Sequence, residues 1–200
     1  MRREALSAVI DALPADAAII APTGLASREL CALRDSPSQF YMMGSMGHGA
    51  AIGTGVSATT RRSVVVLDGD GAILMRLGTL VFVGAMAPTN LLHIVLDNGI
   101  HESTGGQASL SAGVDLCAVA AACGYMSCAE VTSTEALANA VKAARSRQGP
   151  HFIRLHTRAS AGAVPPRIPW PAETIAARFS EALRADDARV IDKTALAGAE

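Results

Sequence analysis

Two short polar clusters in this 200-residue chain carry residue types that bind metal ions and phosphates. The first has the sequence DGDG at residues 68–71, and the second has the sequence DNG at residues 97–99. Asp70 and Asn98 offer a carboxylate and an amide oxygen, and Mg²⁺ takes such hard oxygen ligands together with phosphate oxygens and water. The glycines beside Asp70 let the backbone approach a phosphate. Together the clusters predict a diphosphate–Mg²⁺ site, although each alone also fits an ordinary turn.

The elements that must position these clusters can be inferred from the apolar pattern. Each cluster follows an apolar run, Ser63–Leu67 or Leu91–Leu96, that we expect to be a buried strand. Between the runs lies an expected helix over Ile73–Met86, which Pro88 cannot continue. A strand–helix–strand unit of this length makes its strands parallel, with a right-handed crossover. Both clusters then lie at the carboxyl edge of the sheet, where open α/β sheets bind ligands.

Glycine-rich segments flank this unit on both sides. Residues 43–60 read MGSMGHGAAIGTGVSATT, and the first part predicts a turn in which the backbone comes close to another group. The small residues from His48 to Thr59 predict a tightly packed helix, and the glycine spacing does not match a dinucleotide-binding fingerprint. Residues 99–113 are polar and glycine-rich, so we expect a loop that orders over a ligand.

Length and composition limit the possible classes of protein. The chain fits one α/β domain over residues 1–185, expected to be three-layered (α/β/α) with a mostly parallel sheet, followed by a loosely ordered tail over 186–200. A formal net charge of −1 without charged blocks argues against partners such as nucleic acid or a membrane. No apolar run reaches the roughly 18 residues that span a bilayer. The charged N-terminal helix is not a signal peptide, so we expect a cytoplasmic location, and four cysteines without metal spacing are expected to be reduced core thiols.

The order of the two clusters resembles the thiamin diphosphate motif, in which GDG is followed, after a helix and a strand, by Asn. The stretches YMMGSMGHGAAIG, VVVLDGDGAILMRLGTL and APTNLLHIVLDNGIHESTGGQ resemble more specifically the phosphonopyruvate and sulfopyruvate decarboxylases. The resemblance covers about residues 40–185. It implies the diphosphate-binding (PP) domain of the thiamin diphosphate-binding fold, with thiamin diphosphate and Mg²⁺ as cofactors.

The resemblance also implies a role for individual residues. Mg²⁺ is expected to be held by the side chains of Asp70 and Asn98 and by the backbone carbonyl of Ile100. Backbone N–H groups of Gly71 and Ala72 are expected to contact the diphosphate. In the GSMG turn, the carbonyl of the first glycine would take the 4′-amino group, and the methionine would hold the cofactor in its bent shape. The full cofactor-binding set is Gly44, Ser45, Met46, Gly69, Asp70, Gly71, Ala72, Asn98, Ile100 and His101.

No residue of this chain is identified with certainty as catalytic. His48 and His101 flank the expected site, so either is a candidate for proton transfer or for contact with an acidic substrate group. The alternative is that each is an ordinary loop or helix-cap histidine. Ser103, Thr104 and Gln107 are candidates for contacts to the diphosphate or substrate, with loop solubility as the alternative. His93 lies inside an expected strand and is interpreted as structural.

The implied reaction is the non-oxidative decarboxylation of a small 2-oxo acid. The first candidate is the conversion of 3-phosphonopyruvate to phosphonoacetaldehyde and CO₂, as in phosphonate biosynthesis, and the alternative in the same class is sulfopyruvate decarboxylation by a beta subunit. Two further alternatives stay open: a carboligase of the acetolactate-synthase type, and a non-catalytic diphosphate-binding module.

A glutamate that activates the cofactor belongs, in such enzymes, to a separate pyrimidine-binding domain. About 40 residues precede the GSMG turn, and Glu29, Glu102 and Glu130 do not match the context of that glutamate. We therefore expect a separately encoded pyrimidine-binding (alpha) subunit to supply it, in a hetero-oligomer of the α2β2 type or larger.

Overall fold

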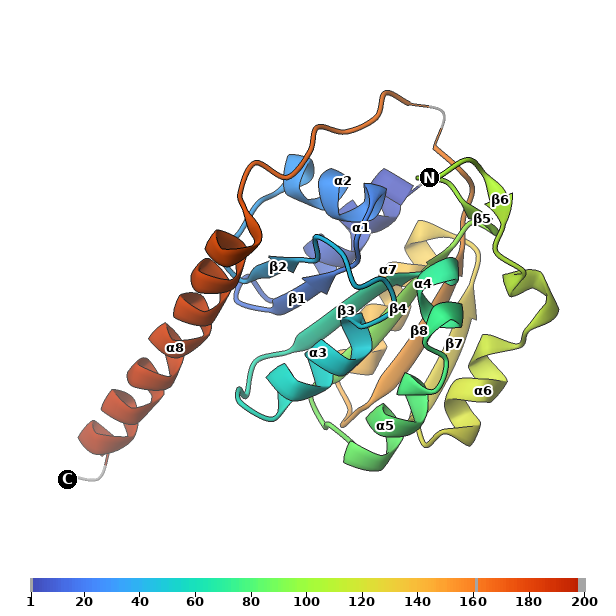
Figure 1. Ribbon diagram of the computed structural model, residues 1–200. Coiled ribbons are helices and arrows are strands. Elements are labelled where there is room, and N and C mark those ends of the chain that lie inside the picture. Colours follow the sequence, from blue (N-terminus) through green and yellow to red (C-terminus); the bar gives the residue numbers. More distant parts are fainter. Residues whose placement is uncertain (1, 161, 198–200) are drawn as a thin grey trace.

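The computed structural model describes residues 2–160 and 162–197, with side chains up to residue 185. Its centre is a six-stranded sheet in the order β2-β1-β3-β4-β8-β7, and every neighbouring pair of strands is parallel (Figure 1). The expected parallel sheet is therefore confirmed. The strands are β1 (Ala18–Ala21), β2 (Gln39–Tyr41), β3 (Val64–Gly69), β4 (Leu91–Asp97), β7 (Ser127–Val131) and β8 (His151–His156).

Helices cover both faces of this sheet, which gives the expected three layers (Figure 1). Strand residues alternate between the faces: Val65 and Leu67 of β3 pack under α1, α2 and α7, whereas Val64 and Val66 pack under α3, α5 and α6. The helices are α1 (Arg2–Ala12), α2 (Leu25–Leu33), α3 (Gly49–Ser57), α4 (Asp70–Met75), α5 (Thr79–Met86), α6 (Leu116–Ala122), α7 (Thr134–Arg145) and α8 (Ala172–Ala197), with one 3₁₀ turn at Ser111–Gly113.

The central β3–α4–α5–β4 unit has the topology expected from the sequence. Strands β3 and β4 pair in parallel with Gly69 opposite Leu96, so both polar clusters lie at the same edge of the sheet. The single helix expected over Ile73–Met86 is wrong, because α4 starts directly at Asp70 and ends at Met75, and α5 starts at Thr79. The break contains Gly78, and glycine is a weak helix former.

Two other segments are compared with the structure. The expected loop over residues 99–113 contains a small antiparallel pair, β5 (Ile100–His101) with β6 (Gln107–Ala108). The last helix, α8, runs from Ala172 to Ala197 and projects away from the sheet (Figure 1). The division into a domain over 1–185 and a tail over 186–200 stays a prediction, and residues 198–200 lie outside the described residues.

Two expectations about the class of protein can be compared with the structure. Within residues 2–160 and 162–197, no helix is both long and apolar enough to cross a membrane. All four cysteines are free thiols, as expected, but each is half-buried at the margin of the core and not inside it.

Candidate active site

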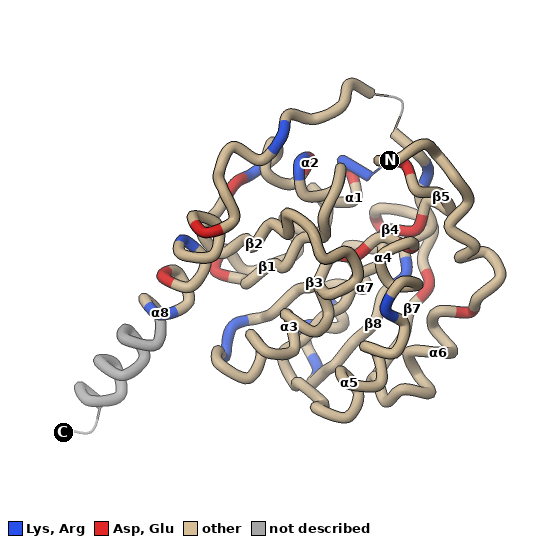
Figure 2. Tube along the Cα trace, in the orientation of Figure 1, with Lys and Arg blue, Asp and Glu red and all other residues tan. Residues whose placement is uncertain are grey.

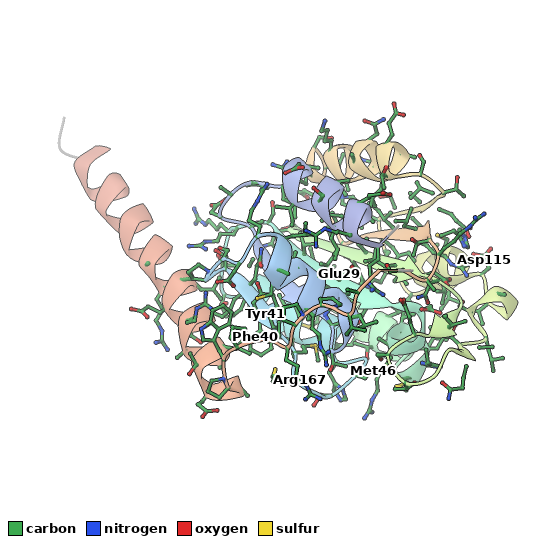
Figure 3. All side chains as sticks on the ribbon, turned by 90° about the horizontal axis from the view of Figure 1, so that it is seen from above. Glu29, Phe40, Tyr41, Met46, Asp115 and Arg167 are labelled. Carbon is green, nitrogen blue, oxygen red and sulfur yellow. The ribbon has the colours of Figure 1, made fainter. Side chains whose placement is uncertain are left out.

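A cavity of about 390 Å³ opens at the carboxyl ends of β3 and β4. Both polar clusters contribute to its wall, as do the loop after Asn98, the turn at Met46 and the start of α2. Figure 3 labels Met46 and Glu29, which come from different segments of the chain. Of the expected cofactor-binding residues, the cavity is lined by Met46, Gly69, Asp70, Gly71, Ala72, Asn98, Ile100 and His101.

Asp70 begins α4 and is only 3% exposed, although it lines the cavity. Its Oδ2 accepts a hydrogen bond from the hydroxyl of Ser109. Burial raises the pKa of Asp70 above its ordinary value, and the charge of Asp97 raises it further, while the bond from Ser109 opposes the shift. A buried carboxylate of this kind gains stability from a cation placed beside it.

The two residues that flank Asp70 in the cavity wall, Gly69 and Gly71, are glycines and have no side chain. A Cβ added at Gly69 would have no atom within 4 Å, so the space beside it is open. A Cβ added at Gly71 would lie 2.3 Å from the Cε1 atom of His101, so the imidazole ring packs directly on this glycine. The backbone is therefore open beside the buried carboxylate at Gly69, which suits a phosphate group held close to the backbone.

Asn98 follows β4 and has an amide whose orientation is set on both sides. Its Nδ2 donates to Oε2 of Glu102 at 2.9 Å, and its Oδ1 accepts from the backbone N–H of Ile100 at 3.1 Å. A carbonyl-type oxygen has two lone pairs, so Oδ1 keeps one for a further partner. Asn98 and Asp70 line the same cavity, and their juxtaposition confirms the geometric expectation from the sequence.

The first aspartate of each cluster, Asp68 or Asp97, pairs with a side chain that is distant in the sequence. Asp68 is buried, with Oδ2 3.1 Å from Nε2 of His93, whose Nδ1 lies 3.1 Å from the hydroxyl of Tyr125. Asp97 accepts from the Arg154 guanidinium. Asp97 is therefore committed to the fold, whereas Asp68 pairs with His93 through Oδ2 and also lines the cavity with Asp70 and Asn98. Among the described residues, the buried Oδ1 of Asp68 has no hydrogen-bond partner. His93 is fully buried within this network, in line with the structural role expected for it.

The residues present fit an Mg²⁺–diphosphate group. Within the described residues, no group of three or more His, Cys, Asp or Glu side chains could hold a metal ion by itself. The expected ligand set is of another kind: one carboxylate from Asp70, one amide oxygen from Asn98 and the backbone carbonyl of Ile100. Mg²⁺ is commonly held by one or two carboxylates, with phosphate oxygens completing the octahedron. The metal assignment itself stays a prediction.

The GSMG turn packs directly against α4. Gly47 has a φ of 87°, and a Cβ there would lie 2.6 Å from the carbonyl oxygen of Ala72 and 2.8 Å from Cγ of Arg76. Because only glycine permits this approach, the turn brings Met46 to the cavity beside the polar clusters. The structure does not place Gly44 or Ser45 among the residues that line the cavity.

The two candidate histidines occupy different environments. His101 lines the cavity, where its ring packs on Gly71. His48 is the N-cap residue of α3, and its Nδ1 lies 3.0 Å from the carbonyl oxygen of Ser45 in its own turn. His48 is not among the residues that line the cavity, so of the two only His101 can contact a ligand there without rearrangement.

Sequence reasoning missed several residues of this site. Ser103, Thr104 and Gln107 were expected near it and do line the cavity, but Arg2, Glu102 and Ser109 were given no role there. Figure 2 shows charged residues of both signs where the N-terminus approaches β5. No local pattern identifies Arg2 or Glu102, because their partners are distant in the sequence.

Comparison with known proteins adds independent findings. The family model for the thiamine pyrophosphate enzyme, C-terminal TPP binding domain, matches residues 24–155. The chain is 50% identical over 180 residues to the phosphonopyruvate decarboxylase of Streptomyces viridochromogenes, covering 89% of this chain and 45% of that protein. It therefore spans about half the length of this relative.

Two further similarities complete the comparison. Sulfopyruvate decarboxylase subunit beta of Methanococcus maripaludis is 36% identical over 169 residues, which cover 84% of this chain and 90% of that subunit. The solved structure of the thiamine diphosphate-dependent 4-hydroxybenzoylformate decarboxylase of Rhodococcus jostii RHA1 is similar with a TM-score of 0.69. That likeness covers 80% of this chain and 33% of the other at 20% identity, so it bears on the fold alone.

Proposed function

From the premise that this chain belongs to the thiamine pyrophosphate enzyme family, as a C-terminal TPP-binding domain, we propose that it forms the diphosphate- and Mg²⁺-binding part of a 2-oxo acid decarboxylase. The observation that carries the proposal is that Asp70 and Asn98, from the ends of adjacent parallel strands, line one cavity. The proposed substrate is 3-phosphonopyruvate, which would yield phosphonoacetaldehyde and CO₂. The 50% identity to a phosphonopyruvate decarboxylase supports this choice.

In this proposal, different residues of the chain hold the metal ion and the diphosphate. Asp70, the Oδ1 atom of Asn98 and the carbonyl of Ile100 hold Mg²⁺, and the N–H groups of Gly71 and Ala72 bind the diphosphate. The bound cofactor supplies an electron sink for the carbanion that the departing CO₂ leaves behind. The open wall at Gly69 and the buried carboxylate of Asp70 support this arrangement.

Other residues of the chain orient the cofactor and its substrate. Met46 supports the cofactor from the GSMG turn, and the backbone of Gly44 and Ser45 faces the pyrimidine end. His101 contacts the acidic group of the substrate or moves a proton near it. Its place on the cavity wall supports His101 over His48 for this role.

A pyrimidine-binding partner supplies the activating glutamate in this proposal. A relative named as a beta subunit matches this chain over 90% of its length, which supports a heteromeric assembly of the α2β2 type or larger. Helix α5 exposes Val81, Phe82 and Met86, and Met75 on the cavity wall is 57% exposed. Apolar surface of this kind is commonly covered by a partner.

Sulfopyruvate is the second candidate substrate. The similarity to a sulfopyruvate decarboxylase beta subunit favours it, since that match covers nearly the whole subunit. Phosphonate and sulfonate groups are both tetrahedral anions. The cavity contains Arg2 as a cationic side chain, but its guanidinium is already paired with Glu29 and Glu102. The contacts that distinguish the two acids are therefore assigned to the partner.

The test is a decarboxylation assay of the chain with and without a pyrimidine-domain partner. With thiamin diphosphate and Mg²⁺, the assembled enzyme should release CO₂ from 3-phosphonopyruvate faster than from sulfopyruvate, and the chain alone should be inactive. A reversed preference would support the second candidate. Equal rates for the chain alone and the assembly would overturn the partner requirement, and no cofactor binding in either state would overturn the proposed function.

A further inference from the structure

A chain of buried charged side chains runs from the N-terminal helix to the cavity. Arg2 of α1 donates from Nε and Nη2 to the two oxygens of Glu29, at 2.8 and 3.0 Å. Its Nη1 donates to Oε2 of Glu102 at 2.5 Å. The side chains of Arg2, Glu29 and Glu102 are 9%, 8% and 16% exposed, so this is not a solvated surface pair.

Glu102 accepts further hydrogen bonds, one of them from Asn98 in the cavity wall. Oε2, which accepts from Arg2, also accepts from Nδ2 of Asn98 at 2.9 Å. Oε1 accepts from the backbone N–H of Ser160 at 3.0 Å. Both oxygens of Glu102 are thus occupied by donors of the protein, which makes this carboxylate a poor candidate for direct coordination of a metal ion.

The chemistry of the neighbours leaves Asn98 one orientation. An ionised carboxylate only accepts hydrogen bonds, so Glu102 must face the NH₂ group of the amide. The N–H of Ile100 only donates, so it must face the amide oxygen. The two constraints agree, and a reversed amide would lose both bonds. The positions of the amide nitrogen and oxygen are therefore fixed by their hydrogen-bond partners.

We propose that Glu102, held by Arg2, is a positioning residue that fixes the Asn98 amide with its oxygen directed to the metal site. The inference rests on the proposed function and deepens it, because it names the groups that prepare the site before Mg²⁺ binds. It also explains the residue type at position 98. An aspartate there would place a second carboxylate against Glu102, whereas an amide offers one donor and one acceptor.

The first test reads the amide directly, without cofactor or activity. The chain contains three asparagines, Asn90, Asn98 and Asn139. In the ¹⁵N-labelled chain, Glu102→Ala should shift the side-chain NH₂ signals of Asn98 and accelerate their exchange with water. Asn90 donates to the carbonyls of Thr60 and Arg62 and serves as an internal control that should not move. Unchanged Asn98 signals would overturn the proposal.

The second test measures metal affinity in a double-mutant cycle. Mn²⁺ binding in the presence of thiamin diphosphate is followed by electron paramagnetic resonance. Glu102→Ala should weaken it by about 10–100-fold, the usual effect of losing a group that orients a metal ligand. In an Asn98→Ala background, Glu102→Ala should add little. Glu102→Gln should recover part of the affinity, because its amide oxygen can still accept from Asn98.

The outcomes separate this inference from the proposed function. Equal losses in both backgrounds would mean that Glu102 acts only through general stability, and would overturn its positioning role. Failure of the unmodified chain to bind Mn²⁺ both alone and with its partner would overturn the proposed function, whereas the NH₂ signals of Asn98 would still test the positioning role of Glu102. Arg2→Met removes the side chain that holds Glu102. Its matched control is Arg34→Met, which removes an exposed ion pair between Arg34 and Asp11 of α1. Only Arg2→Met should weaken Mn²⁺ binding.

Discussion

The Arg154 guanidinium donates two hydrogen bonds to one oxygen of Asp97, from Nε at 2.9 Å and from Nη2 at 2.7 Å. The other oxygen of Asp97 accepts from the N–H of Gly99 and from the hydroxyl of Ser111. The side chains of Asp97 and Arg154 are 4% and 6% exposed. Both oxygens of this carboxylate are therefore occupied by partners within the fold, and the polar residue that lines the cavity is the next one, Asn98.

Breaking this buried ion pair should destabilise the protein strongly. Arg154→Met leaves the Asp97 carboxylate buried with one partner fewer, and such a loss costs about 3–5 kcal/mol. Urea denaturation should show this decrease in the free energy of unfolding. The double variant Asp97→Leu, Arg154→Met should be more stable than Arg154→Met alone, since it removes the unpaired charge. A double variant less stable than the single one would contradict the assignment.

Removal of the Asp70 carboxylate should abolish the Mg²⁺-dependent part of cofactor binding. Asp70→Ala is expected to weaken thiamin diphosphate binding by more than about 100-fold, because in the proposed function Asp70 is a direct metal ligand and not merely an orienting neighbour. Isothermal titration calorimetry with Mg²⁺, compared with EDTA, measures the effect. Asp11→Ala removes an exposed carboxylate on α1 and should bind as the unmodified chain does. Unchanged affinity of Asp70→Ala would remove Asp70 from the metal site.

Two glycine substitutions should shift stability in opposite directions. A Cβ at Gly84 of α5 would lie 1.6 Å from the carbonyl oxygen of Cys123, so Gly84→Ala must push α5 away from the end of α6. We expect a loss of about 1–3 kcal/mol. Gly55 of α3 is exposed, with no atom within 4 Å of an added Cβ, so Gly55→Ala should gain about 0.5–1 kcal/mol from the lower helix cost of alanine. Thermal unfolding of the two variants should therefore give melting temperatures on either side of the unmodified chain.

Cys117 should react slowly with alkylating reagents in the folded protein. Burial raises the pKa of Cys117 to about 11, from an ordinary value of 9.0, and the nearby charges of Cys128, Glu130 and Asp115 act in the same direction. At pH 8 this lowers the thiolate fraction roughly 100-fold. Iodoacetamide labelling mapped by mass spectrometry should show slow modification of Cys117 that accelerates in urea.

The pH dependence of Cys117 follows from the sign of this shift. A folded-state pKa above the unfolded value means that its stabilising contribution is present below pH 9 and is lost as the pH rises toward 11. Labelling of the folded chain should therefore increase through this range. A folded-state rate at pH 8 equal to the rate in urea would contradict the raised pKa.

Much of the site follows from local pattern. Apolar runs of strand length, glycine at the turns and a helical connection determine that β3 and β4 are parallel neighbours, and this alone brings Asp70 and Asn98 to one edge. The break between α4 and α5 was not predicted, because residues 73–86 are mostly apolar and the interrupted region contains only one glycine, Gly78, to signal it. The short β5–β6 pair was likewise hidden by glycine-rich, polar composition.

The sequence by itself determined the residue types of the site, their order and the edge of the sheet at which they meet, because strand period and turn chemistry are local properties. Tertiary structure alone decided which distant side chains pair with the polar residues of each cluster. Asp68 is hydrogen-bonded to His93, 25 residues away, and Asp97 accepts from Arg154, 57 residues away. Arg2 reaches Glu102 across 100 residues. Such pairings depend on which side chains the packed layers bring within hydrogen-bond distance, and no local spacing records them.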